Sequence, residues 1–325
     1  MTTAANQNAM ALDFPAAPTG KSGWPWENTL ASPSKTNGER VSIVVPCYQG
    51  GDYLEESLRS LILQNHPDLE IIVMDGGSTD NTPEILAKYQ PWIARMESKP
   101  DRGQSHAINK GLALATGDYF NWHNADDVLL PGSLRETLAG FETHPDAMYI
   151  SRHRKLLHTD GREEEKPNRP RPGVVDIRRA LISACPGAQP GGLMRMDAVR
   201  EAGGVDESFK CCMDEELMMK LRMRGPGYYL DGPGILFRVH PGQQSTVLLD
   251  ERIREKFLII DRVYAAMPED DPLRELRASS LVFASRHAAG LCERANHPLR
   301  AKAWKLRALA HRLAARAKGV EIEYL

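Results

Sequence analysis

The chain has 325 residues, of which 42% are hydrophobic and 26% are charged, and these fractions exclude bulk disorder and a fibrous repeat. Its 41 Lys and Arg nearly balance its 43 Asp and Glu, so the formal net charge of -2 gives no global attraction for nucleic acid. No apolar run approaches the roughly 20 residues of a membrane-spanning helix, and the first residues lack the pattern of a signal peptide. We therefore expect a cytoplasmic globular protein that does not bind nucleic acid.

Residues 1–40 are predicted to form an N-terminal arm, because they are polar and aperiodic. The run Gly-Trp-Pro-Trp at 23–26 interrupts this pattern. Two tryptophans are unusual in a free tail, so we expect this run to pack on the domain as a hydrophobic anchor.

Strands and helices alternate from residue 41 onward. The predicted strands are 41–47, 69–75, 93–98 and 118–123, and the predicted helices between them are 54–62, 82–89 and 104–115. This alternation indicates an α/β fold with a mostly parallel sheet and helices on both faces. We assign residues 41–246 to this domain.

The pattern is less regular after residue 150. Residues 152–172 are rich in Arg, Lys, Glu and Pro, which predicts a surface excursion. Further helices are expected at 197–202, 214–224 and 250–266, with a strand at 235–240. Residues 247–325 are assigned to a C-terminal helical extension.

Polar residues follow three of the predicted strands, at the edge where open parallel sheets bind ligands. These are Tyr48 after the first strand, Asp75 at the end of the second, and residues 124–127 after the fourth. Asp75 precedes Gly-Gly-Ser, so a turn residue is the alternative interpretation of this position.

Asp126 and Asp127 are adjacent carboxylates at a strand end, and each raises the pKa of the other unless a positive charge lies nearby. A divalent cation meets that requirement, and oxygen ligands suit Mg²⁺ or Mn²⁺, which complete their shell with phosphates and water. This arrangement indicates a nucleotide ligand. The alternative is that the pair caps a helix beginning near Ser133.

Two other nucleotide-binding patterns are disfavoured. No GxGxxG sequence follows the first strand, and Gly20-Lys21-Ser22 lacks the earlier glycine of a Walker loop because Pro15 stands there. Dinucleotide-dependent oxidoreductases and P-loop hydrolases are thus unsupported.

Four segments together resemble family 2 glycosyltransferases with the GT-A fold, a Rossmann-like sheet with helices on both faces. They are VSIVVPCYQGGDYLEESLRSLILQ, IIVMDGGSTDNT, DRGQSHAINKGLALATGDYFNWHNADD and FRVHPGQQST, in that order between residues 41 and 246. The GWPW run and the DGGSTD variant are similar to a bacterial branch associated with surface-polysaccharide assembly.

The resemblance implies a nucleotide site at the first two strand ends. Asp75 would accept a hydrogen bond from the uracil ring, which favours a uridine nucleotide, and Tyr48 would stack on the base. Pro46, Asp80 and Arg102 match further nucleotide positions. For Arg102 a surface ion pair with Asp101 is the alternative.

Asn124-Ala125-Asp126 occupies the family's DxD metal motif, with asparagine in place of the first aspartate. Metal ligation therefore falls on Asp126 or Asp127, while Asn124 can bond a ribose or a metal-bound water. His240 matches an Arg-x-His position that reaches the metal or the diphosphate.

The resemblance also implies the catalytic residues. Asp214 stands where the family places its base, although a plain N-cap is the alternative interpretation. Glu215 is the first substitute for it and a candidate acceptor contact. Gln189 is expected to shape the acceptor pocket.

The implied function is that of an inverting, Mn²⁺- or Mg²⁺-dependent glycosyltransferase that moves a sugar from a UDP-sugar to a hydroxyl of a glycan or lipid-linked acceptor. The alternatives are an inactive nucleotide-sugar-binding scaffold and a nucleotidyltransferase. The glycine-rich, lysine-containing entry loop of the latter is absent after Val45.

Residues 299–318 contain seven Lys or Arg, no acid, and leucines at roughly helical spacing. Two interpretations are open. A basic amphipathic helix can lie on an anionic membrane at the inner face of the cytoplasmic membrane, or its leucines can pack on the catalytic domain.

Overall fold

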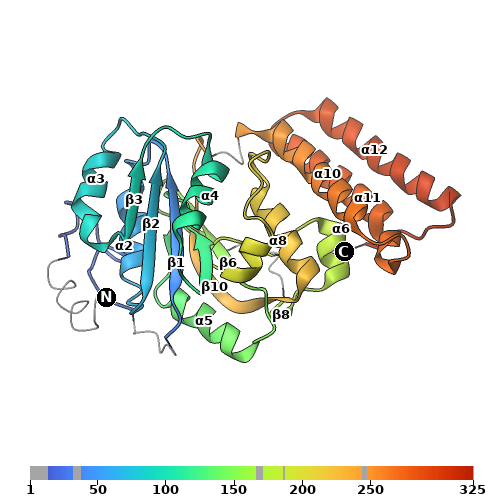
Figure 1. Cartoon of the computed structure of the whole chain (residues 1–325). Helices are drawn as coiled ribbons and strands as arrows, with labels where there is room; N and C mark the ends of the chain where they lie inside the picture. The colour runs from blue at the N-terminus through green and yellow to red at the C-terminus, as the bar shows by residue number, and fades with distance from the viewer. Residues whose placement is uncertain (1–13, 32–37, 166–170, 186, 244–246, 325) are drawn as a thin grey trace.

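The computed structural model describes residues 14–31, 38–165, 171–185, 187–243 and 247–324. A ten-stranded sheet forms the centre of the molecule, and an all-helical part lies to one side of it (Figure 1). The end of the predicted FRVHPGQQST motif, residues 244–246, lies outside the described residues, as does much of the polar stretch before residue 40.

The strand order is β3-β2-β1-β4-β9-β6-β10-β5, with β7 paired to β6 and β8 to β10. The strands are β1 (Val41–Cys47), β2 (Leu69–Asp75), β3 (Arg95–Ser98), β4 (Tyr119–Trp122), β5 (Val128–Leu129), β6 (Tyr149–His158), β7 (Glu163–Glu165), β8 (Gly173–Val174), β9 (Leu193–Arg195) and β10 (Gly227–Val239). The longer pairings, β1 with β2 and β6 with β10, are parallel, and the antiparallel pairings are short. The sheet is therefore mostly parallel, as predicted.

Helices cover both faces of the sheet because side chains alternate along each buried strand. Val41, Ile43 and Val45 of β1 join one core cluster with α2 (Leu54–Ile62), α3 (Thr82–Tyr89) and α5 (Ser133–Thr143). Val44 joins the other cluster with α4 (Gln104–Leu114) and α8 (Met213–Arg224).

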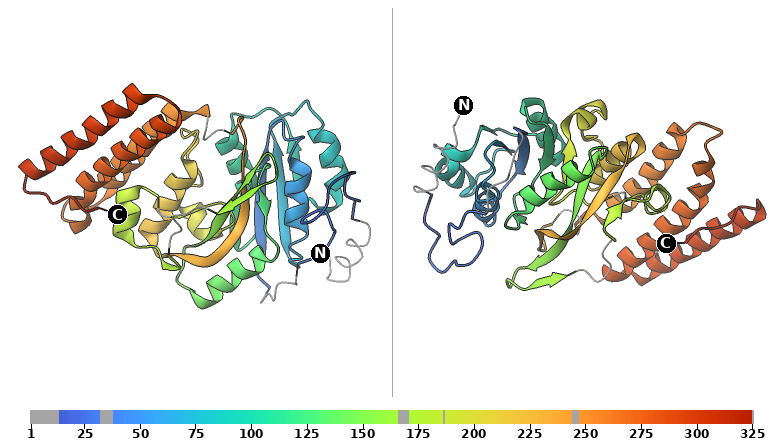
Figure 2. Two further views of the ribbon diagram at one scale, coloured as in Figure 1. Left: turned by 180° about the vertical axis from the view of Figure 1, so that it is seen from behind. Right: turned by 90° about the horizontal axis from the view of Figure 1, so that it is seen from below.

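The remaining helices are α6 (Ile177–Ser183), α7 (Met196–Glu201), α10 (Leu249–Ala266), α11 (Arg277–Arg294) and α12 (Pro298–Ala317), with short 3-10 turns at Gln90–Trp92 and Pro272–Leu276. They extend the second core, except α12, which packs in a separate cluster with α10 and α11. Residues of α10 and α11 belong to the same hydrophobic cluster as α8. Views from behind and from below place α10, α11 and α12 together beside the sheet (Figure 2). Among the described residues, no helix is long and apolar enough to cross a membrane.

The prediction of a surface excursion at 152–172 is wrong for residues 152–158, which form part of β6 inside the sheet. Arg152 is only 2% exposed, and its guanidinium pairs with Glu136 at 2.8 Å. Charged residues in this strand are tolerated because they find partners, a feature that residue type alone does not indicate.

The N-terminal arm is bound to the domain by a buried arginine. Arg59 of α2 is 0% exposed, and it donates hydrogen bonds to the carbonyls of Pro15 at 2.8 Å and Pro25 at 3.1 Å and to the hydroxyl of Tyr89 at 2.9 Å. Trp24 adds a hydrogen bond from its ring nitrogen to the carbonyl of Leu129 at 2.8 Å. The tryptophan run thus packs on the domain, while the boundaries at residues 40 and 246 stay predictions.

We expect Arg59→Ala to lower the free energy of unfolding by more than about 2 kcal/mol, because several buried acceptors lose their donor at once. The measurement is chemical denaturation, with limited proteolysis to detect release of residues 14–31. Lys88→Ala, which removes a more exposed cation paired with Glu55, is the matched control and should change stability little. Equal stability of the Arg59 variant and the wild type would contradict this role of Arg59.

Candidate active site

The carboxyl ends of β1 and β2 place Tyr48 and Asp75 together. Cys47 lies opposite Asp75 in the parallel register, and Tyr48 follows directly with 68% of its side chain exposed. Its ring lies against Gly76, where a Cβ atom would come within 3.2 Å of Cδ2 of Tyr48. Pro46 is buried within β1 opposite Met74.

The Asp75 carboxylate is buried and binds its own loop. It accepts hydrogen bonds from the Ser78 amide at 3.1 and 3.2 Å, from the Ser78 hydroxyl at 2.5 Å and from the Ser98 hydroxyl at 2.5 Å. In this structure the Asp75 side chain therefore acts as a turn residue, which is the alternative interpretation given above. A carboxylate has about four acceptor sites, and these four contacts use them, so a ligand that binds Asp75 must displace one of its serine contacts.

Asp80 and Arg102 also have partners within the protein. Asp80 accepts hydrogen bonds from the amides of Gly51 at 2.8 Å and Thr82 at 3.0 Å, and so joins two loops at this edge. Arg102 is exposed and pairs with Glu207 at 2.6 Å, whereas the alternative interpretation named Asp101 as its partner. Its guanidinium must exchange this partner if it is to bind a diphosphate.

The loop after β4 points its two aspartates in different directions. Asp127 is 0% exposed, and its two oxygens accept hydrogen bonds from the Arg238 amide and the Asn124 side chain, each at 3.0 Å. Burial, and then the charge of Asp126, raise the pKa of Asp127 well above its usual value. The Asn124 side-chain oxygen accepts from Gln104 at 2.9 Å. Both oxygens of Asp127 are thus bound by groups inside the protein.

Asp126 instead lies beside His240. Its Oδ2 is 3.0 Å from Nε2 of His240, and their side chains are 26% and 18% exposed. Among the described residues, no group of three or more His, Cys, Asp or Glu side chains could hold a metal by itself. Asp126 and His240 are therefore the pair available for a cation whose other ligands come from elsewhere.

Arg238 of β10 organises this pair, and sequence reasoning gave it no role. Its Nε donates to the carbonyl of Asp126 at 2.7 Å, and its Nη2 donates to Glu56 of α2 at 3.0 Å. It is only 7% exposed and its guanidinium lies 4.6 Å above the ring of Tyr53. Its position two residues before His240 is the sequence signal that could have found it.

Asp214 lies in the first turn of α8 and is half-buried. The N-cap of this helix is Cys212, so the N-cap interpretation of Asp214 is wrong. Burial, and then the charge of Glu215, raise the pKa of Asp214 to about 6. A carboxylate with such a pKa can accept a proton at near-neutral pH.

Helix α10 holds the residues around Asp214 in place. Glu255, which is 0% exposed, accepts hydrogen bonds from the amides of Lys210, Cys211 and Cys212 at 2.7 to 3.0 Å. The next residue, Lys256, forms a buried ion pair with Glu215. Glu215 is consequently engaged in an ion pair within the protein.

Arg154 of β6 carries a positive charge that acts on two carboxyl groups of the candidate site. Its positive charge opposes the raised pKa of both Asp127 and Asp214, so it lies near each of them. Its guanidinium lies 4.7 Å above the ring of Phe237. Sequence reasoning missed it because it falls in the segment predicted as a surface excursion.

Gln189 is buried under the site. Its side-chain nitrogen donates to the Asn121 side chain and to the carbonyl of Trp122, each at 2.6 Å. Gln189 therefore fixes the loop that follows it. Any contribution to an acceptor pocket is through that loop.

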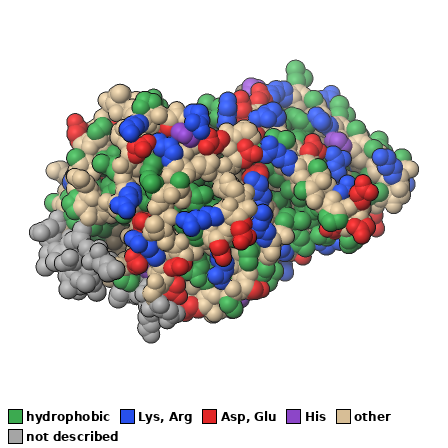
Figure 3. Space-filling model, in the orientation of Figure 1, with side chains coloured by type: hydrophobic (Ala, Val, Ile, Leu, Met, Phe, Trp, Pro, Cys, Tyr) green, Lys and Arg blue, Asp and Glu red, His purple; other side chains and the backbone are tan. Residues whose placement is uncertain are grey.

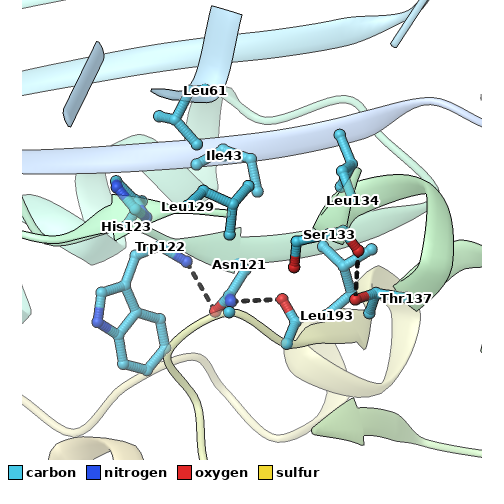
Figure 4. Close-up of a pocket in the computed structure, with 12 residues that line it drawn as sticks. Ile43, Leu61, Asn121, Trp122, His123, Leu129, Ser133, Leu134, Thr137 and Leu193 are labelled. Atoms are coloured by element: carbon cyan, nitrogen blue, oxygen red, sulfur yellow. Dashed lines mark hydrogen bonds between the residues drawn. The ribbon is translucent and has the colours of Figure 1, made fainter. Parts of the chain in front are cut away.

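An internal cavity of about 20 Å³ lies between β4, β9 and α5 (Figure 4). Asn121, His123, Ser133 and Thr137 are among its lining residues. It has room for about one water molecule, whereas small-molecule sites measure roughly 300 Å³ or more. The candidate site is instead assigned to the loops after β1 and β4, which carry Tyr48 and Asp126, together with Asp214 at the start of α8.

Comparison with known proteins gives a family match over the first part of this site. Residues 42–202 match the model described as glycosyl transferase family 2. An uncharacterized glycosyltransferase of Nostoc is 31% identical over 128 residues, which are 38% of this chain and 39% of the relative. One of Rickettsia conorii is 29% identical over 218 residues, which are 63% of this chain and 35% of the relative. The chain thus spans well under half of either relative, and Asp214 and His240 lie beyond the family match.

Solved structures confirm the predicted GT-A fold. S. aureus TarS 1-349 in complex with UDP-GlcNAc has a TM-score of 0.54 at 17% identity, over 88% of this chain and 94% of that one. The mannosyltransferase PcManGT from Pyrobaculum calidifontis, in complex with GDP-Man and Mn²⁺, has a TM-score of 0.59 at 19% identity, over 88% and 78%. At these identities the likeness concerns the fold.

We expect Asp75→Ala to lower the thermal midpoint, because the hydroxyls of Ser78 and Ser98 and the Ser78 amide lose their acceptor. The loss should be about 1–3 kcal/mol, as for other buried polar groups left unpaired. Asp52→Ala changes an exposed aspartate in the loop after β1 and is the control. An unchanged midpoint for the Asp75 variant would mean that its carboxylate serves the ligand alone.

Proposed function

We propose that this chain, whose residues 42–202 belong to glycosyl transferase family 2, transfers a sugar from a nucleotide-sugar to a hydroxyl acceptor with inversion at the anomeric carbon. The observation that carries the proposal is the set of groups that the structure provides: the exposed ring of Tyr48 beside Asp75, the pair of Asp126 and His240, and Asp214 with its raised pKa. The charge of Arg154 acts on both Asp127 and Asp214.

The donor is proposed to be a UDP-sugar. Tyr48 is exposed enough to stack on a base, and Asp75 lies at the end of the neighbouring strand. Asp75 would accept the ring N–H of uracil in exchange for one of its serine hydroxyls. The neighbour in complex with UDP-GlcNAc supports a uridine donor, whereas the one in complex with GDP-Man shows that this fold also holds a guanine nucleotide.

The residues present fit a divalent cation at Asp126 and His240. One carboxylate and one imidazole form an incomplete ligand set, which Mn²⁺ or Mg²⁺ completes with phosphate oxygens and water. A bound cation there would neutralise charge on the departing nucleoside diphosphate. The structure of the mannosyltransferase PcManGT, which has a similar fold and contains Mn²⁺, supports this assignment. Asp127 is not part of the proposed ligand set, because its oxygens are used inside the protein.

Asp214 is proposed as the general base. It accepts the proton of the acceptor hydroxyl as the hydroxyl oxygen attacks the anomeric carbon and the bond to the diphosphate breaks. Glu255 and Lys256 keep the start of α8 in position for this step. Arg154 places positive charge near the reacting groups, where it can interact with the leaving diphosphate.

The acceptor is proposed to be a glycan or a lipid-linked hydroxyl compound in polysaccharide biosynthesis. An assay that offers UDP-sugars in one tube, and UTP with sugar phosphates in another, tests the reaction. Release of UDP supports the proposal. Release of pyrophosphate identifies a nucleotidyltransferase, and nucleotide binding without turnover identifies a scaffold protein.

We predict that UDP raises the thermal midpoint more in Mn²⁺ than in EDTA, because the diphosphate and Asp126 are both anionic. Asp126→Asn should abolish the metal-dependent part of the shift. Asp127→Asn is the matched comparison and should retain it, since that side chain faces the interior. A metal-dependent shift that survives Asp126→Asn would remove Asp126 from the ligand set.

We predict that Asp214→Asn reduces the transfer rate by about 10² or more and leaves UDP-sugar binding near normal. For the wild type, kcat/KM should fall as the pH drops through about 6, because protonated Asp214 cannot act as a base. Glu215→Gln is the comparison and should retain a larger share of the rate. Transfer by Asp214→Asn within a few-fold of the wild type would place the base elsewhere.

A further inference from the structure

Helix α12 packs on the molecule through small residues. Ala301, Ala308 and Ala315 are 2%, 6% and 5% exposed, and they repeat every seven residues along one face. Trp304 beside them stacks on Phe257 of α10, with ring centroids 5.3 Å apart. The alternative that the leucines pack on the catalytic domain is therefore wrong.

The leucines lie on the opposite face of α12. Leu299, Leu306 and Leu313 are 83%, 59% and 55% exposed, and they also repeat every seven residues. Each stands two residues before a buried alanine, or about 200° around the helix. Exposed alanines at 303, 310 and 317 each follow one of these leucines by four residues, on the same face. Together they form an outward apolar stripe about 27 Å long at 1.5 Å per residue.

Cations flank this stripe on both sides. Helical spacing places Lys302 and Arg316 along one edge and Arg300 and Arg307 along the other. Arg300 is paired with Asp250. Among the described residues, Lys302, Arg316 and Lys318 have no ion-pair partner. Blue and green side chains lie side by side on the upper right of the molecule, where Figure 1 places α12 (Figure 3).

We propose that the outward face of α12 docks on an anionic membrane surface, with the leucines in the headgroup boundary and the flanking cations at the lipid phosphates. Exposed leucines between rows of Lys and Arg, with no acid between residues 299 and 318, match the chemistry of such a surface. This face lies outside the proposed catalytic site.

A second copy of the chain fits this face less well. The leucine and alanine repeat has the 3-4 spacing of a coiled-coil seam. The residues that flank such a seam would be Arg300, Lys302, Arg307 and Arg316, so two copies would set cations against cations. Charge complementarity therefore favours a negatively charged surface.

Cosedimentation of the full-length protein with vesicles tests the proposal. The vesicles contain either phosphatidylcholine alone or equal parts of phosphatidylcholine and phosphatidylglycerol. We expect binding only to the anionic vesicles, and loss of binding at about 0.5 M salt. The variant Leu299→Gln/Leu306→Gln/Leu313→Gln should bind at least about tenfold more weakly. Lys302→Gln/Arg316→Gln should also weaken binding.

The control variant is Leu114→Gln/Met223→Gln, which changes exposed apolar residues elsewhere and should bind like the wild type. Thermal midpoints close to that of the wild type establish that the α12 variants are folded. Absence of binding to anionic vesicles overturns the proposal, as does equal binding by the triple leucine variant. A dimer that the leucine changes dissociate, in a protein that does not bind vesicles, would assign this face to self-association.

Discussion

The arrangement of the site depends on Arg238, which serves acidic residues from two other parts of the chain. Its backbone amide binds Asp127, its side chain binds the carbonyl of Asp126, and its guanidinium pairs with Glu56 of α2. These contacts fix the end of β10 against the loop after β4, and so place His240 beside Asp126. Since the arginine is buried, its interactions are weakly screened and restrict the loop strongly.

The contacts of Arg238 also change which residues are candidates to bind a metal ion. Two adjacent aspartates suggest a cation because their charges repel, but the buried Asp127 carboxyl is held by the Arg238 amide and the Asn124 side chain. Its pKa is raised by burial and by the charge of Asp126, and the charge of Arg154 opposes this rise only in part. Asp127 is then accounted for by the fold itself. The case for a metal ion depends instead on Asp126 and His240, which are partly exposed at the edge of the sheet.

The region from Val41 to Trp122 was predictable because β1, β2 and β4 are apolar and its helices have clear periodicity. Its strand ends identify where ligands approach. Strand β6 was not predictable, because its charged side chains resemble those of a surface loop and find partners in other elements, such as Glu136 of α5 and Glu163 of β7. The surroundings of Asp214 were also beyond sequence reasoning. Their hydrogen bonds come from α10, about 40 residues further along the chain.

The hydrogen bonds between Glu255 and the backbone before α8 limit how this chain can be recombined with related chains. Because its buried carboxylate binds the backbone just before α8, the C-terminal helices support the start of the helix that carries Asp214, the proposed base. A chimera that joins residues up to 243 to a foreign C-terminal part would leave those amides without an acceptor. Exchange of acceptor specificity between such proteins should therefore move α8 and α10 as one unit.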